Sequence, residues 1–338
     1  MSKKTYREAI REALDLEMAR DPRVILIGED IAGGKEASGE DDAWGGVMGV
    51  TKGLIGKYGH DRVLDTPISE LAIIGAAAGA AVTGMRPVAE LMFNDFIGVS
   101  LDQLMNQAAK FRYMFGGKVK TPMVVRTQYG GGLRAAAQHS QTLYSILAHI
   151  PGLKVVAPSN PYDAKGLLIA AIRDDDPVIF MEHKAMYDDV GEVPDEAYTV
   201  PLGEGRVLGE GDDVTVIALG RMVKLAEEAI RAVRAEGISC TLLDPRSISP
   251  LDEELMLELA EETGRVVIVD EANPRCGVAA DLSSIIAEKA FGSLKAPIRK
   301  VTAPHTPVPF SPNLEDAYLP SAARIAAAIR ETHSWERD

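Results

Sequence analysis

Helix-like and strand-like patterns alternate along almost the whole chain, and this alternation restricts the fold more than any other feature. A helical pattern at 5–20 places Tyr6, Ala9 and further apolar residues on one face, as a 3.6-residue period requires. Short runs of β-branched and aliphatic residues follow, among them RVILIGED (23–30) and RPVAELMF (86–93). Strands that alternate with helices form parallel sheets covered by helices. The sequence therefore predicts an α/β fold.

One segment interrupts the alternation, at 187–213, where glycine, proline and acidic residues concentrate. Strand and helix patterns resume after it. A chain of 338 residues also exceeds what a single core usually serves. We therefore expect a first α/β domain at 1–185, a linker at 186–210 and a smaller α/β domain at 211–338.

Charge and composition exclude several classes of partner. The net charge of −14 argues against nucleic acid and anionic membranes, whose binding depends on clustered Lys and Arg. Two cysteines without a CxxC spacing argue against a disulfide framework and favour a reducing compartment. The small-apolar stretch at 71–85 is short for a membrane span, and the first residues lack a targeting pattern. We expect a bacterial cytoplasmic protein.

Glu70 stands where the strand pattern RVLDTPISE (62–70) meets a helix of small residues at 70–85. In open α/β sheets, ligands bind just beyond the carboxyl ends of the strands. The carboxylate could serve only the helix dipole. Alternatively, apolar surroundings could raise its pKa, so that it shares a proton with a heterocycle nitrogen. The residues alone leave both interpretations open.

His139 follows three glycines (130–132) and lies in the small-residue segment AAAQHSQTL (135–143). We expect a glycine loop and then a helix that carries this histidine. The residue is either a packed structural histidine or a catalytic group in a space that small neighbours keep open, whereas His149 and His183 are expected to be structural. The chain lacks GxGxxG, P-loop, GxSxG and HExxH motifs and a diphosphate-binding segment of the GDG…N type. The residues present therefore resemble half of a site.

Six ordered blocks carry a family resemblance that extends from about residue 4 to residue 330. They are DTPISE, GAAAGAAVTGMRPVAELMFNDF, DQLMNQAAKFRYMFGG, AAQHSQ, HIPGLKVVAPSNPYDAKGLL and AIRDDDPVIFMEHK. Together they resemble the β subunit of the thiamine-diphosphate-dependent 2-oxo acid dehydrogenase E1 component. Within that family, DDAWGGVMGVTKGL, ELMFNDFIGVSLDQ and FRYMFGGK are most similar to acetoin dehydrogenase β subunits.

The resemblance implies a transketolase-like architecture, with a pyrimidine-binding domain followed by a transketolase C-terminal domain. It also implies an α2β2 heterotetramer with an E1 α subunit, which holds the diphosphate of thiamine diphosphate and Mg²⁺. This division of labour explains the missing diphosphate motif. The remaining partners are the lipoyl domain and the basic peripheral-subunit-binding domain of an E2 acyltransferase. Acidic residues near the chain end are consistent with a basic partner: Glu315, Asp316 and Asp338.

The resemblance also assigns roles to residues. Glu70 matches the glutamate that hydrogen-bonds the aminopyrimidine ring and thereby promotes loss of the thiazolium C2 proton, while the cofactor performs the carbanion chemistry. Phe96 matches the aromatic residue that packs on the pyrimidine, and Met92 and Ile68 match other pocket walls. His139 matches a histidine that orients or protonates the lipoyl group, a task suited to its near-neutral pKa.

A potassium site in some relatives matches Met123, Ala171, Asp174 and Asp176, mostly through backbone carbonyl oxygens. Asp176 stands where one relative has asparagine. A solvated helix end is the alternative interpretation of RDDD (173–176). Because aspartates at a helix C-terminus oppose its dipole, a nearby cation would relieve them.

The expected activity is cleavage of acetoin, with transfer of the acetyl unit to E2-bound lipoamide and release of acetaldehyde. The alternative within the family is oxidative decarboxylation of pyruvate or a branched-chain 2-oxo acid. A non-catalytic scaffold subunit predicts loss of Glu70 or His139, and both are present. A stand-alone transketolase-type enzyme requires a diphosphate-binding half that this chain lacks.

Overall fold

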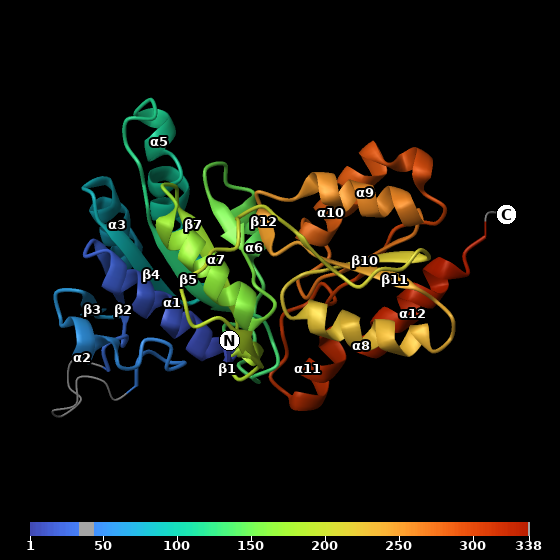
Figure 1. The fold of residues 1–338 in the computed structure, drawn as a ribbon, viewed down its shortest axis with the longest axis horizontal. Coiled ribbons are helices and arrows are strands. Elements are labelled where there is room, and N and C mark those ends of the chain that lie inside the picture. The colour runs from blue at the N-terminus through green and yellow to red at the C-terminus, as the bar shows by residue number, and fades with distance from the viewer. Residues whose placement is uncertain (34–43, 337–338) are drawn as a thin grey trace. The chain divides into compact units, whose positions relative to one another are not determined.

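The computed structural model describes residues 1–33 and 44–336. These residues form two compact units, which we describe separately (Figure 1). The first unit comprises Met1–Tyr129 and Ile146–Leu202, and the second comprises Gly130–Ser145 and Gly203–Asp338. The sequence after residue 30 is rich in glycine and acidic residues and predicts a surface loop, most of whose acidic part, at 34–43, lies outside the described residues. Among those that are described, no helix has the length and hydropathy that a bilayer crossing requires.

The first unit is built on a parallel sheet, as the alternation predicts. Its strands lie in the order β6-β7-β5-β4-β2-β3, and each neighbouring pair is parallel. Parallel strands buried on both faces read as continuous apolar runs, which VILI in β2 illustrates. The strand bounds are β2 (Val24–Glu29), β3 (Val63–Thr66), β4 (Arg86–Phe93), β5 (Val124–Tyr129), β6 (Lys154–Val156) and β7 (Val178–His183).

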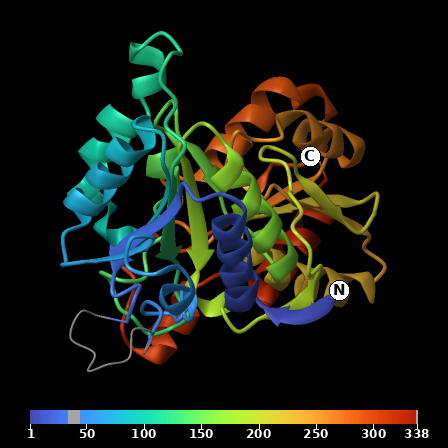
Figure 2. The ribbon, with the colours of Figure 1, turned by 60° about the vertical axis from the view of Figure 1, so that its left-hand side comes forward.

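Helices cover both faces of this sheet (Figures 1 and 2). Helices α1 (Tyr6–Arg20) and α7 (Pro161–Arg173) pack on one face, where Val24 and Leu26 join their buried cluster. Helix α3 (Glu70–Val82) packs on the other face against β4, followed by α4 (Ile97–Asp102). Shorter elements of this unit are α2 (Leu54–Tyr58), α5 (Phe111–Met114), η1 (Asn94–Phe96), η2 (Gln103–Ala108) and η3 (Lys184–Met186), with α6 (Tyr144–Ala148) entering it.

Two features of the first unit differ from the sequence prediction. The sequence pattern at 96–117 predicts one long helix that ends at Gly116 and Gly117, but the π-helical turn η2 interrupts it. Just after this turn the chain lies close to Gly152, where a β-carbon would be 2.1 Å from the Ala109 carbonyl oxygen. The expected linker also contains a strand, β8 (Val190–Val193), which pairs antiparallel with the unpredicted β1 (Ser2–Thr5).

The second unit has a five-stranded sheet in the order β14-β13-β10-β11-β9, antiparallel only at β9. Helices α8 (Met222–Arg234) and α12 (Ala322–His333) pack together over its main core. The short helix α11 (Pro312–Tyr318) was not predicted. The other bounds are β9 (Arg206–Leu208), β10 (Val214–Ala218), β11 (Cys240–Asp244), β12 (Ser247–Ser249), α9 (Glu253–Thr263), β13 (Val266–Val269), α10 (Val278–Lys289), η4 (Phe291–Ser293) and β14 (Arg299–Val301).

Candidate active site

Four predicted site residues gather at one edge of the first unit's sheet. Ile68 and Glu70 follow the carboxyl end of β3, and Met92 and Phe96 end or follow β4. Strand β2 lies between β3 and β4 and ends at Glu29, which is in register with Thr66 of β3. Because all three strands are parallel, their carboxyl ends meet at the same edge, where ligands bind in open α/β sheets.

Glu70 opens helix α3 and is partly buried. The preceding Ser69 does not cap the helix, because its hydroxyl donates to the Pro67 carbonyl at 3.1 Å. Within the described part of the chain, the Glu70 carboxylate has no hydrogen bond or ion pair. Its negative charge reaches Glu29. Burial raises the pKa of Glu29, and the nearby carboxylates of Asp30, Glu70 and Glu90 raise it further. A carboxylate left open at a helix N-terminus suits contact with a ligand nitrogen.

The predicted wall residues lie at the same strand-end edge as this carboxylate. Ile68 is 76% exposed, unusual for its type. Met92 stands where the register of β4 against β5 shifts, and such irregularities re-aim a side chain. Phe96 packs edge-to-face on Phe93, with ring centroids 6.0 Å apart. The three predicted wall residues thus supply apolar side chains at the edge of the sheet that carries Glu70.

A buried charge network lies in the same sheet, and the sequence analysis missed it. Arg126 of β5 donates to both carboxylate oxygens of Glu182, at 2.6 and 2.8 Å, and to Glu90 at 2.7 Å. The Tyr187 hydroxyl donates to Glu182 at 2.6 Å. Burial raises the pKa of Glu90, and Arg126 opposes the rise. The available signal was a charged residue inside an apolar strand pattern.

His139 belongs to the second unit and does not lie on a helix, contrary to the prediction. It occupies an irregular loop, and α6 begins only at Tyr144. The cause is the backbone before it: Gly130, Gly132, Arg134 and Ala136 all have positive φ angles, between 57° and 97°. Left-handed residues cannot propagate a right-handed helix. The histidine is partly exposed.

The acidic residues near the chain end do not all face outward. Glu315 is fully buried and accepts hydrogen bonds from residues 132 and 134, so it presents no charge to a partner. Asp316 is exposed but pairs with Arg134 at 2.7 Å. Asp338 lies outside the described residues.

The residues matched to a potassium site meet at the end of α7. Two backbone carbonyl oxygens each accept one N–H: Met123 from Val178 at 3.0 Å, and Ala171 from Asp174 at 3.2 Å. The Asp174 side chain forms an ion pair with Lys154, and the Asp176 side chain forms one with Arg112.

Protein cations thus neutralise the two aspartates at this helix end. Nearby, the buried Thr121 hydroxyl has no hydrogen-bond partner among the described residues. Its backbone links it to the junction, because the Met123 N–H donates to the Thr121 carbonyl at 2.8 Å. Neutral oxygens with spare acceptor capacity fit a monovalent cation.

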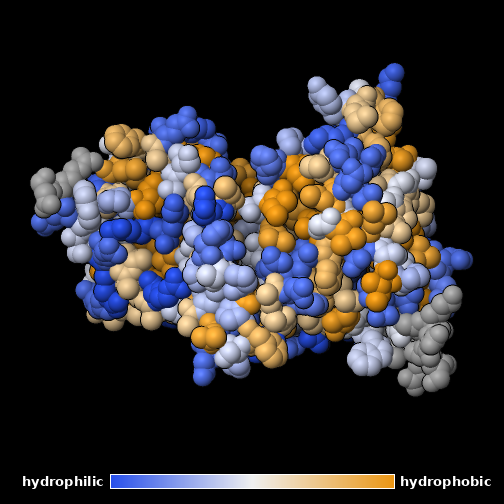
Figure 3. Space-filling model, turned by 180° about the vertical axis from the view of Figure 1, so that it is seen from behind, coloured by the Kyte–Doolittle hydropathy of each residue, from blue (hydrophilic) through white to orange (hydrophobic). Residues whose placement is uncertain are grey.

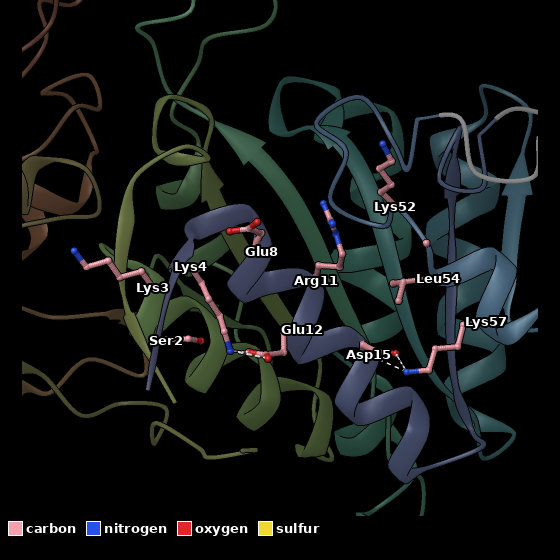
Figure 4. A pocket seen from close by; sticks show the side chains of 11 residues that line it. Ser2, Lys3, Lys4, Glu8, Arg11, Glu12, Asp15, Lys52, Leu54 and Lys57 are labelled. Atoms are coloured by element: carbon pink, nitrogen blue, oxygen red, sulfur yellow. Dashed lines mark hydrogen bonds and ion pairs between the residues drawn. The ribbon is translucent and has the colours of Figure 1, made fainter. Parts of the chain in front are cut away.

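A pocket of about 510 Å³ lies elsewhere on the first unit, among β1, α1 and α2 (Figure 4). Two ion pairs lie in its lining: Lys4 pairs with Glu12 at 2.5 Å, and Lys57 pairs with Asp15 at 2.6 Å. None of the predicted site residues lines it. The candidate chemistry therefore lies at the strand ends and in the His139 loop.

Comparison with known proteins decides the family. Residues 2–189 match the family "Transketolase, pyrimidine binding domain", and residues 203–325 match "Transketolase, C-terminal domain". The chain is 62% identical to the acetoin:2,6-dichlorophenolindophenol oxidoreductase subunit beta of Cupriavidus necator, over 96% of each chain. The chain belongs to the E1 β subunit family. The predicted transketolase-like fold is also confirmed.

Other E1 β relatives and a solved structure agree. The Bacillus subtilis protein of the same name is 57% identical, over 96% of this chain and 95% of its own. The 2-oxoisovalerate dehydrogenase subunit beta of that organism is 43% identical, over 98% and 99%. A structure entitled "Split gene transketolase, inactive beta4 tetramer" is 25% identical, with a TM-score of 0.78 over 98% of this chain and 99% of that chain.

Proposed function

We propose that the chain is the β subunit of an α2β2 E1 enzyme that cleaves acetoin. The enzyme transfers the acetyl unit to E2-bound lipoamide and releases acetaldehyde. Lipoamide gains the two electrons and one proton that convert its disulfide to a thioester and a thiol, which balances the reaction. Two relatives at 62% and 57% identity carry acetoin in their names, whereas the 2-oxoisovalerate relative is 43% identical. Pyruvate is the alternative substrate.

The open Glu70 carboxylate is the observation that carries the proposal. Thiamine diphosphate, when bound, supplies a carbon nucleophile for the substrate carbonyl and an electron sink for the resulting carbanion. Glu70 would share a proton with the aminopyrimidine ring nitrogen. Ile68, Met92 and Phe96 would hold the ring and exclude water, which strengthens that hydrogen bond.

His139 would act on the lipoyl group. A neutral imidazole can accept a hydrogen bond, and an imidazolium can donate a proton. Because the pKa of free histidine is near neutrality, both states are accessible to this residue type. The disulfide sulfur that leaves as a thiolate needs such a proton. We therefore assign His139 to acyl transfer rather than to cleavage of acetoin.

An E1 α subunit would supply what this chain lacks, namely the ligands for the diphosphate and Mg²⁺. Seen from behind, apolar side chains gather on the first unit (Figure 3). Exposed apolar residues of α3, α4 and η2 are Leu71, Val82, Val99 and Met105. Patches of this kind mark protein interfaces. We assign this face to subunit assembly, K⁺ to the oxygens of Met123 and Ala171, and E2 docking to the second unit.

Two measurements test the proposal. The chain, purified together with its α subunit, is assayed on acetoin and on pyruvate with thiamine diphosphate, Mg²⁺ and 2,6-dichlorophenolindophenol. Acetoin should be the better substrate, and the chain alone should be inactive. Faster turnover of pyruvate would refute the substrate assignment, and activity of the chain alone would refute the half-site.

Glu70→Gln should slow exchange of the cofactor C2 proton at least about a hundredfold, the usual scale of a positioned acid–base group. Glu254→Gln, in the first turn of α9, is the matched control for loss of a helix-dipole charge. Equal exchange rates in the two variants would remove the role of Glu70. A scaffold subunit would show no dependence on either residue.

A further inference from the structure

In the loop that carries His139, the two ends are hydrogen-bonded to each other and the backbone between them is strained. The Gly130 N–H donates to the Gln141 carbonyl at 3.1 Å, so the two ends of the loop meet. Between them Arg134 and Ala136 have φ angles of 57° and 61°. Non-glycine residues avoid this region, and they persist there only when surrounding contacts enforce it. Something outside the loop must therefore hold it.

Two carboxylates from distant parts of the second unit bind the loop through hydrogen bonds. Glu271, 4% exposed, accepts the Gly131 N–H at 2.5 Å. Glu315, fully buried in α11, accepts the Gly132 N–H at 2.9 Å and the Arg134 N–H at 3.2 Å. The Arg134 guanidinium adds a charge-assisted bond to Glu315 at 2.7 Å. Such bonds are about twice as strong as neutral ones.

The contact is also tight. A β-carbon on Gly131 would lie 2.9 Å from the Leu319 Cδ2 and 3.3 Å from a Glu315 oxygen. Downstream of the histidine, the Tyr144 hydroxyl donates to the buried Asp270. The loop is therefore fixed on both sides of His139 by side chains from 270–271 and from 315–319.

We infer that Glu315 is a positioning residue for the acyl-transfer step: its buried carboxylate enforces the left-handed backbone of Gly132 and Arg134 and so sets where His139 meets the lipoyl group. This inference rests on the role proposed for His139. Because Glu315 is fully buried and bonds to the loop, it would act through the loop. A glutamine there presents an amide N–H₂ where two backbone N–H groups and a guanidinium all need an acceptor.

The test measures two rates on the same heterotetramer preparation: acetylation of a purified lipoyl domain, and reduction of 2,6-dichlorophenolindophenol. Their ratio corrects for loss of folded enzyme, which lowers both rates together. Glu315→Gln should lower the ratio at least about tenfold, and the double variant with His139→Ala should fall no further than His139→Ala alone. Asp316→Asn, which removes only the exposed partner of Arg134, should retain the wild-type ratio.

Gly132→Ala is the second variant, in case Glu315→Gln does not fold. At a φ of 97° alanine is strained, so it distorts the loop while leaving the carboxylate intact, and the ratio should fall again. An unchanged ratio in Glu315→Gln, or losses that multiply in the double variant, would overturn the positioning role alone. An unchanged ratio in His139→Ala would overturn both this role and the proposed function of the histidine.

Discussion

Replacing Arg126 with methionine should destabilise the first unit far more than the same replacement of an arginine in a surface ion pair destabilises the protein. Arg126 is 2% exposed and is the cation for Glu182 and Glu90, which are themselves 0% and 5% exposed. Removing one partner of such a network leaves uncompensated buried charge, a loss of about 3–5 kcal/mol in the free energy of unfolding. In a unit of this size each kcal/mol lowers Tm by roughly 2–4 °C. The expected decrease is therefore roughly 6–20 °C.

The loss should depend on pH. Burial already raises the pKa of Glu90, and loss of Arg126 raises it further. A carboxyl group with a raised pKa in the folded state holds a proton that the unfolded chain releases, so stability falls as pH rises through that range. The variant should therefore recover part of its Tm deficit as pH decreases from about 8 towards about 5, closer to ordinary carboxyl values.

Thermal unfolding of the heterotetramer at both pH values measures these effects. Arg330→Met is the control, because Arg330 pairs with Glu236 with both side chains almost half exposed, and such pairs contribute at most about 1 kcal/mol. A double variant, Arg126→Met with Glu182→Gln, removes one buried charge and should regain part of the loss. A single variant no less stable than the control, or a deficit that grows as pH decreases, would refute the reasoning.

Further predictions concern the backbone and a buried lysine. Gly84 and Gly152 have φ angles of 105° and 103°, but of the two only Gly152 faces a backbone atom. Gly84→Ala should lower the free energy of unfolding by about 1–2 kcal/mol through backbone strain, and Gly152→Ala by at least about 2 kcal/mol more through the clash. Equal denaturation midpoints for the two variants would contradict the clash. Lys165 is fully buried and donates to Glu12 at 2.7 Å and to the Pro194 carbonyl at 2.5 Å. Lys165→Met should therefore lower the free energy of unfolding by about 2–4 kcal/mol, whereas Lys57→Met should lower it by at most about 1 kcal/mol. Similar Tm values for the two variants would show that the buried bonds of Lys165 add no stability beyond that of a surface ion pair.

Patterns of neighbouring residues were sufficient to predict the main elements. The apolar periodicity of 5–20 and the β-branched run at 23–30 correspond to α1 and β2. The placement of Glu70 beyond a strand end was also predictable, because parallel topology brings carboxyl ends together. The matched site residues gained their roles from the family resemblance, and those roles stay predictions.

The features that the sequence analysis missed depend on residues far apart in the chain. Glu315 looks like a surface acid from its neighbours, yet its partners Gly132 and Arg134 lie more than a hundred residues earlier. The helix expected at His139 failed for the same reason, because contacts with α11 enforce left-handed angles that local propensity disfavours. Arg126 likewise gains its meaning only when β4, β5 and β7 align Glu90 and Glu182 beside it.

The carboxylate hold on the His139 loop also has a consequence for the order of synthesis. Residues 130–141 leave the ribosome long before Glu271 and before Glu315 in α11. Until then, the backbone N–H groups of Gly131, Gly132 and Arg134 lack the acceptors that they have in the folded chain. The strand ends around Glu70 need no such late partner. A nascent chain would therefore complete the sheet edge that carries Glu70 early and the His139 loop only near termination, so that C-terminal truncation should disturb the loop before it disturbs the sheet.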